Sequence, residues 1–317
     1  MSELMIETCG LTRRFGSQHA LNGIDVLLHR GKVLGLLGHN GAGKTTLVRI
    51  LTTVLPPTSG TARVGGFDVV RDAREVRRII GLTGQYASID EQLSGYDNLV
   101  LIARLLGAGR TDARRRADEL LQLFELSSAA RRPSRTYSGG TRRRLDLAAS
   151  LVGDPELLFL DEPTTGLDPV SRTGLWDLVG RRVQNGTTVL LTTQYLEEAD
   201  RLADTITVLS DGRIVAAGTA TQLKAQIGRR TVHVTLANTE QAQHAARRLQ
   251  DTGRTAVVDP TGLGISTPVT RTADLVEVVR TVDEPTAEIT EVSLTEPTLN
   301  DVYLAFARRD AEALTRR

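Results

Sequence analysis

Short apolar runs alternate with helical patterns through the first two thirds of the chain. Residues 33–37 and 157–160 are continuous apolar runs, which are typical of strands buried on both faces of a parallel sheet. The same reasoning predicts further strands at 5–11, 23–28, 187–191 and 206–209, and helices at 45–55, 98–106, 112–126, 174–183 and 195–203. Strands that alternate with helices predict an α/β fold whose parallel sheet is covered on both faces.

The pattern changes after about residue 224. Strands are predicted at 232–236, 256–258, 264–266 and 287–294, and helices at 239–250, 273–282 and 299–309. The order strand–helix–strand–strand–helix–strand is typical of the ferredoxin-like arrangement. We therefore predict two domains, residues 1–225 and a small α+β accessory domain of residues 226–317.

Composition excludes several classes of protein. The 317 residues are 40% hydrophobic and 24% charged, with a formal net charge of +1, which argues against a nucleic-acid-binding domain because such domains are usually distinctly basic. The arginine runs 114–116 and 142–144 are interpreted as solvated helix faces.

The single cysteine, Cys9, excludes an intrachain disulfide framework. Residues 1–4 suggest no signal peptide, and no apolar run approaches the roughly 20 residues of a membrane helix. If the protein acts on a membrane, a partner must supply the membrane part.

A glycine-rich segment follows the buried run 33–37. Residues 38–45 read Gly-His-Asn-Gly-Ala-Gly-Lys-Thr and match the phosphate-binding loop G-x-x-x-x-G-K-[ST] between a strand and a helix. Backbone N–H groups and the helix N-terminus favour an anion there. Lys44 is expected to bind the β- and γ-phosphates, and Thr45 to ligate Mg²⁺.

Two other strand ends carry polar side chains. Asp161 and Glu162 follow the apolar run 157–160, and Gln194 follows the run 189–191. At the carboxyl edge of a parallel sheet, Asp161 would face the Mg²⁺ site and Glu162 would polarise the attacking water. Gln194 could hydrogen-bond the γ-phosphate or the water. Taken alone, the acidic pair would more commonly be a helix N-cap, and Gln194 would be an ordinary glutamine at a strand end.

The segment Tyr137-Ser138-Gly139-Gly140-Thr141 resembles the signature of ABC transporter ATP-binding subunits, commonly L-S-G-G-Q. Other motifs of that family occur in the expected order. Phe15 resembles the aromatic residue that stacks on adenine, Gln85 resembles the glutamine that touches Mg²⁺, and residues 166–169 resemble the loop that communicates across the dimer. The resemblance covers about residues 4–224.

This resemblance implies a P-loop NTPase fold with a helical subdomain at about residues 86–150. It implies an ATPase coupled to transport, with ATP and Mg²⁺ as cofactors. The implied catalytic residues are Lys44, Glu162 and Gln194, and the implied Mg²⁺ ligands are Thr45, Gln85 and Asp161. The implied nucleotide-binding residues are Phe15, Gly38, Asn40, Gly41, Ala42, Gly43, Lys44, Thr45, Thr46, Gln85, Ser138, Gly139 and Gly140.

Three departures distinguish this sequence from the common family pattern. Tyr137 and Thr141 replace Leu and Gln of the signature, and Gln194 replaces the usual switch histidine. Glutamine can orient water or phosphate but cannot carry a positive charge. With residues 83–88, 142–146, 193–200 and 297–304, these departures look like the daunorubicin-resistance type of antibiotic exporter ATPase, in which the extra domain is implicated in assembly with the membrane subunit.

The resemblance also implies partners. Two copies would form a head-to-tail homodimer with two ATP molecules between them, each ATP meeting Ser138, Gly139 and Gly140 of the opposite subunit. A separate membrane permease would be contacted near residues 85–98, which places the protein in the cytoplasm, peripheral on the inner face of the cell membrane. Two alternatives stay open: a soluble ATPase of this superfamily acting on ribosomes or DNA, and a nucleotide-sensing subunit without turnover.

Overall fold

The computed structural model describes residues 3–83, 89–227, 230–284, 287–295, 298 and 302. Its contacts divide the described residues into two compact units, one ending at Ala220 and the other beginning at Thr221. Each unit has its own hydrophobic core.

A six-stranded sheet forms the centre of the first unit. Its order is β11-β10-β4-β9-β8-β7, and every neighbouring pair is parallel except β10 and β11. The strands are β4 (Val33–Leu37), β7 (Ile80–Thr83), β8 (Leu157–Asp161), β9 (Thr188–Thr193), β10 (Thr205–Ser210) and β11 (Arg213–Gly218). Every residue of β4, β8 and β9 is buried, so the parallel α/β sheet predicted from the apolar runs is confirmed.

A second, antiparallel sheet was not predicted. It consists of β1 (Leu4–Phe15), β2 (Gln18–Ile24), β3 (Leu27–His29), β5 (Ser59–Val64) and β6 (Phe67–Asp68). The single strand expected at 23–28 is wrong, because β2 ends at Ile24 and β3 begins at Leu27. The Thr8 hydroxyl donates to the Ile24 carbonyl at 2.9 Å and accepts from the Val26 N–H at 2.8 Å. This side chain takes the place of ladder bonds and breaks the strand.

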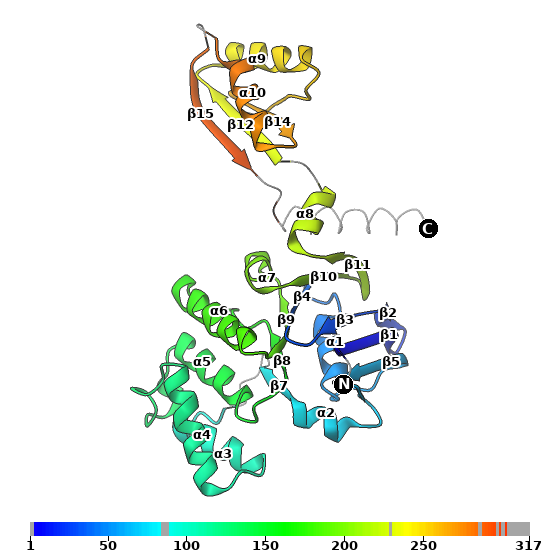
Figure 1. Ribbon diagram of the computed structural model, residues 1–317, viewed down its shortest axis with the longest axis vertical. Helices are drawn as coiled ribbons and strands as arrows, with labels where there is room; N and C mark the ends of the chain where they lie inside the picture. The colour runs from blue at the N-terminus through cyan, green and yellow to red at the C-terminus, as the bar shows by residue number, and fades with distance from the viewer. Residues whose placement is uncertain are drawn as a thin grey trace. The chain divides into compact units, whose positions relative to one another are not determined.

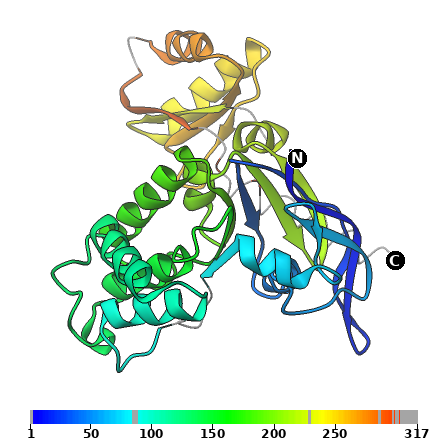
Figure 2. The same cartoon turned by 60° about the horizontal axis from the view of Figure 1, so that its bottom comes forward.

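Helices surround the central sheet, some packed on its strands and others mainly on neighbouring helices. They are α1 (Lys44–Leu51), α2 (Ala73–Ile79), α3 (Gly95–Leu105), α4 (Arg110–Leu123), α5 (Gly139–Ser150), α6 (Pro169–Gln184) and α7 (Leu196–Leu202), with a short 3₁₀ turn, η1 (Ser134–Thr136). Figures 1 and 2 show α3, α4 and α5 grouped on one side, away from β1, β2 and β5. Helix α1 is shorter than the predicted 45–55. The Thr52 hydroxyl donates to the Val48 carbonyl, and Thr53 has φ +66°, so the helix ends before the prolines.

The second unit confirms the predicted order of elements. After α8 (Ala220–Ile227) come β12 (Arg230–Leu236), α9 (Thr239–Asp251), β13 (Val257–Val258), β14 (Gly264–Val269), α10 (Thr272–Val282) and β15 (Ile289–Thr295). The sheet order is β13-β14-β12-β15 and all pairs are antiparallel, as in ferredoxin-like domains. The helix expected at 299–309 falls outside the described residues except at Val302. Among the helices that the structure describes, none is long and apolar enough to span a bilayer.

A buried carboxyl joins α6 to α7. Glu198 is 0% exposed, and its Oε1 accepts a hydrogen bond from Trp176 Nε1 at 2.9 Å. Burial raises the pKa of Glu198, and hydrogen bonds with Thr193 and Trp176 only partly oppose this. The folded protein therefore binds this proton more tightly than the unfolded chain does.

We expect Glu198→Gln to change the pH dependence of stability. Because the folded pKa is raised, the wild type loses stability as the pH rises above the ordinary value of 4.5 and through the folded pKa. The neutral amide keeps an acceptor for Trp176 and has no such loss. Urea unfolding from pH 4 to pH 8 should show the variant gaining stability relative to the wild type as the pH rises. A difference independent of pH would contradict the expectation.

Candidate active site

The loop between β4 and α1 is shaped by its glycines and by one lysine. Gly41 and Gly43 have φ values of +89° and +109°, in the region that L side chains rarely adopt. The Lys44 side chain is 5% exposed, and its Nζ donates to the carbonyls of Gly38 at 2.7 Å and His39 at 3.1 Å. Lys44 begins α1, so the loop ends at a helix N-terminus with a buried cation beside it. Such a combination binds phosphate.

The two carboxylates lie beside this loop, at the end of β8. Glu162 Oε1 is 3.9 Å from Lys44 Nζ, although 118 residues separate them along the chain. Asp161 is 5% exposed, and its Oδ1 accepts from the Thr192 hydroxyl at 2.5 Å. Burial lowers the pKa of Lys44, while the charges of Glu162 and Asp161 raise it. A cation is thus held against two acids in a poorly solvated place.

Thr192 is a site residue that sequence reasoning missed. Its carbonyl and hydroxyl accept from the Glu162 N–H at 3.0 and 3.1 Å, and the hydroxyl also donates to Asp161. Thr192 of β9 therefore holds the Asp161 carboxylate and the backbone of Glu162, the residue after β8. The only signal in the sequence was that Thr192 lies at the end of an apolar run, as the two acids lie at the end of another.

The N-terminus of α5 carries the serine–glycine–glycine segment. Ser138 caps the helix, accepting from the Thr141 N–H at 3.2 Å, and the two hydroxyls are 2.8 Å apart. Ser138 and Gly139 are exposed. The Tyr137 hydroxyl donates to the Ala129 carbonyl at 2.6 Å. Both departures in this segment therefore have structural roles: Thr141 completes the cap and Tyr137 anchors the segment to a neighbouring loop.

The remaining expected residues lie at more open positions. Phe15 ends β1 and is 48% exposed, with the Arg13 guanidinium 4.8 Å from its ring centroid. Gln194 follows β9 and is exposed, as is Asn40 in the loop. Gln85 lies outside the described residues. Gly38, Ala42 and Gly43 are buried in the loop, Gly41 is exposed, Gly140 is half-buried, and Thr45 and Thr46 are half-buried in the first turn of α1.

The donor set suits Mg²⁺ bound together with a phosphate. Among the residues that the structure describes, no three or more His, Cys, Asp or Glu side chains form a metal-binding group. Mg²⁺ usually takes one or two carboxylates and completes its octahedron with substrate phosphates and water. The Asp161 carboxylate and the Thr45 hydroxyl are hard oxygen ligands of this kind, so the residues present fit the ion.

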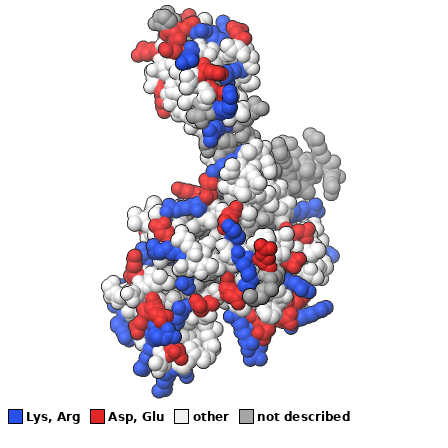
Figure 3. Space-filling model, viewed as in Figure 1, with Lys and Arg blue, Asp and Glu red and all other residues white. Residues whose placement is uncertain are grey.

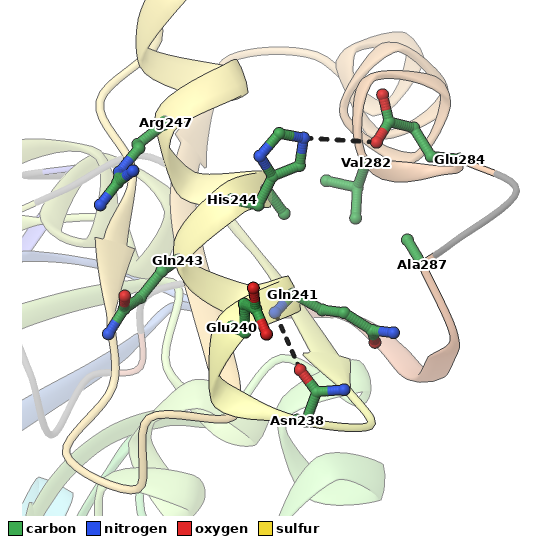
Figure 4. A pocket seen from close by; sticks show the side chains of 10 residues that line it. Asn238, Glu240, Gln241, Gln243, His244, Arg247, Val282, Glu284 and Ala287 are labelled. Atoms are coloured by element: carbon green, nitrogen blue, oxygen red, sulfur yellow. Dashed lines mark hydrogen bonds and ion pairs between the residues drawn. The ribbon is translucent and has the colours of Figure 1, made fainter.

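The second unit has a hollow of its own, of about 590 Å³. It lies along α9 and is bounded by the end of α10 (Figure 4), where His244 Nε2 is 3.4 Å from Glu284 Oε2. Its lining residues are Asn238, Glu240, Gln241, Gln243, His244, Ala245, Arg247, Val282, Glu284 and Ala287. None of them belongs to the expected site.

Comparison with known proteins adds to this geometry. The model of the ABC transporter family matches residues 21–165, and the model described as "ATP-binding protein DrrA1-3-like, C-terminal domain" matches 218–307. The chain is 52% identical over 305 residues to the daunorubicin resistance ATP-binding protein DrrA3 of Streptomyces coeruleorubidus, covering 96% of each chain.

Two solved structures resemble the chain. One is cbiO1 from Clostridium perfringens, part of the ABC transporter complex cbiONQ, with 25% identity, a TM-score of 0.66, and coverage of 80% of this chain and 98% of that chain. The other is a dimeric ATP-binding cassette in a post-hydrolysis state bound to ADP and Pi, with 24% identity, a TM-score of 0.62, and coverage of 68% and 98%.

Gly43 is the loop position where a side chain should do most harm. Besides its φ of +109°, an added Cβ would lie 2.6 Å from the Ala20 carbonyl oxygen. We expect Gly43→Ala to weaken binding of a fluorescent ATP analogue at least tenfold. Gly107→Ala is the matched control, because Gly107 has φ +96° with nothing within 4 Å; it should cost about 1 kcal/mol of stability and leave nucleotide affinity unchanged. Equal effects at the two positions would contradict the interpretation.

Proposed function

Because this chain belongs to the ATP-binding proteins of ABC transporters, we propose that it hydrolyses ATP to drive export of a hydrophobic, drug-like compound through a separate membrane subunit. Support for the transported class comes from relatives named for resistance to daunorubicin and doxorubicin. The relatives match nearly the whole chain, accessory unit included, which disfavours a soluble ATPase acting on ribosomes or DNA.

One observation carries the hydrolytic part of the proposal: Lys44 Nζ and Glu162 Oε1 lie 3.9 Å apart at the mouth of a phosphate-binding loop. With ATP in the loop, the backbone N–H groups hold the phosphates, and the Lys44 ammonium turns from the loop carbonyls to the phosphate oxygens. Glu162 polarises the attacking water as general base. Asp161 and Thr45 would hold Mg²⁺, which neutralises the charge developing on the phosphates.

Gln194 has a narrower role than the histidine it replaces. It lies exposed directly after β9, whose Thr192 holds the two acids. A neutral amide offers two donors and an acceptor, so it can orient the water or the γ-phosphate without transferring a proton. Glu162 then carries the proton chemistry alone.

A head-to-tail homodimer would complete the site. Ser138 and Gly139 present the N-terminus of α5 to solvent, where it can bind an anion brought by a second subunit. Two such ends facing each other exclude water from the phosphates and strengthen the electrostatics. The dimeric cassette similar to this chain supports the assembly.

A groove on the first unit suits a segment of the membrane subunit. It measures about 560 Å³, and its lining residues come before and after the segment 85–98 along the sequence. Two consecutive lining leucines, Leu105 and Leu106, are exposed by 77% and 61%, so the groove has an apolar edge open to a partner. Its lining residues are Arg74, Arg77, Arg78, Ile80, Gly81, Leu82, Ile102, Leu105, Leu106, Ala149, Ser150 and Gly153. Exposed leucines beside three arginines favour an amphipathic segment with acidic residues, and the protein would then be peripheral on the cytoplasmic face of the membrane.

Charge elsewhere does not favour a polyanion. Both signs intermingle over the face drawn in Figure 3. Arg115 and Arg116, from one of the arginine runs, pair with Glu119 on the same helix. Arg115 is exposed, which supports the interpretation of that run as a solvated helix face. Arg116 departs from it, because its partly buried guanidinium also donates to the carbonyls of Leu151 and Val152.

Glu162→Gln should separate binding from hydrolysis. We expect Mg²⁺-dependent ATPase activity in the wild type and a turnover rate lower by about 10²–10⁴-fold in the variant, since general-base catalysis is worth about that much. Because the amide removes a negative charge beside the phosphates, the variant should still bind ATP and form a dimer that light scattering detects. A wild type that binds ATP without hydrolysis, alone and with its membrane subunit, would instead favour the nucleotide-sensing alternative.

The groove can be tested by membrane fractionation. We expect Leu105→Asp with Arg77→Glu to shift the protein from the membrane pellet to the supernatant of producing cells by at least fivefold. Leu27→Asp is the control, because Leu27 is 58% exposed on β3, outside the groove. Comparable release by the control, or none by the double variant, would place the membrane contact elsewhere.

A further inference from the structure

We propose that Arg143 is a positioning residue, which fixes the backbone of the catalytic acid Glu162 from the helix that carries the signature. The proposal rests on the proposed function, because it assigns a role in ATP hydrolysis. Neither its position in an arginine run nor the spacing of the motifs marks this residue in the sequence.

The geometry is that of a planar cation capping the end of a strand. Arg143 Nε donates to the Pro163 carbonyl at 2.6 Å, and one terminal nitrogen donates to the carbonyls of Asp161 and Glu162 at 3.2 and 3.1 Å. One guanidinium therefore binds three consecutive carbonyls where β8 ends. Only arginine has donors in a rigid planar fork that can span such a row.

Glu162 needs this restraint because its backbone is strained. Its φ is +48°, in the left-handed region that is unfavourable for a residue with a Cβ atom. Thr192 holds the Glu162 N–H from β9, and Arg143 holds the carbonyl side from α5. The two contacts together determine where the carboxylate points, and through it the 3.9 Å approach to Lys44.

The neighbouring arginines of α5 have other partners. Arg142 pairs with Glu91 at 2.5 Å, and Arg144 pairs with Glu125 at 3.1 Å. Of these three arginines, only Arg143 has described contacts with the end of β8. Burial lowers the pKa of its guanidinium, and the negative charges of Asp146, Asp161 and Glu198 oppose this shift. The three carbonyls that accept its hydrogen bonds offset the cost of partly burying the guanidinium charge.

The connection has a consequence for the dimer. Ser138, the N-cap of helix α5, would contact the nucleotide held mainly by the opposite subunit, and Arg143 lies little more than one turn further along the helix. A shift of α5 on nucleotide engagement reaches the Glu162 backbone through one rigid side chain. Arg143 thus couples the signature of one shared site to the catalytic acid of the other.

The test compares Arg143→Ala and Arg143→Lys with Arg144→Ala, an adjacent control outside the strand-end contacts. We expect Arg143→Ala to lower kcat by about 10–100-fold, the scale of a misplacement near 1 Å, with KM and nucleotide affinity within about twofold of the wild type. Arg143→Lys should recover part of kcat, because an ammonium keeps the charge but cannot span the three carbonyls. Each kcat is calculated per subunit that binds ATP, so misfolded protein does not lower it.

A double-mutant cycle distinguishes positioning from general stability. If Arg143 acts through Glu162, its replacement should cost less than about threefold in a Glu162→Asp background, where the carboxylate is already displaced. An undiminished loss in that background, or the same loss in Arg144→Ala, would overturn the proposal. A wild type without turnover would sink the proposed function instead, a result that the variants cannot produce.

Discussion

The turn at the end of β8 is the constraint on which the site depends. The chain leaves a fully buried strand at Asp161 and bends at Glu162, whose backbone lies in the left-handed region that favours glycine. A glutamate there is tolerated because the surroundings over-determine it: Thr192 binds the N–H, and Arg143 binds the carbonyls on either side. The strain and its restraints lie at the reacting group, as is common for functional positions.

The departures from the common signature differ in kind. Thr141 shares its hydroxyl with Ser138 and Tyr137 reaches the Ala129 carbonyl, so both substitutions keep the N-terminus of α5 in place while it stays exposed. Gln194 has no such structural role and instead changes what the site can do, because an amide cannot be protonated. The first two preserve the anion site, and the third leaves proton transfer to Glu162.

Apolar runs predicted the central sheet because a strand buried on both faces has little room for polar residues: β4 has none, β8 has one at its last residue, and β9 has them only at its two ends. The glycine-rich loop and the acidic pair were predictable for the same reason, since each follows such a run. The break between β2 and β3 was not, because it is made by Thr8, which is 16 residues from Ile24. Thr192 and Arg143 were missed likewise: their partners are 30 and 18–20 residues away, and no local pattern records such contacts.

The run Arg142–Arg143–Arg144 shows how a charge pattern misleads when it is taken as one feature. A helix rotates about 100° per residue, so three consecutive side chains must leave α5 in three directions. Arg142 reaches the segment before α3, Arg144 reaches the turn after α4, and Arg143 turns inward to β8. The helix that presents the signature is thereby tied to three separate parts of the first unit. Its N-terminus cannot move toward a nucleotide without straining at least one of these contacts, and the contact to β8 is the one that ends at the catalytic acid.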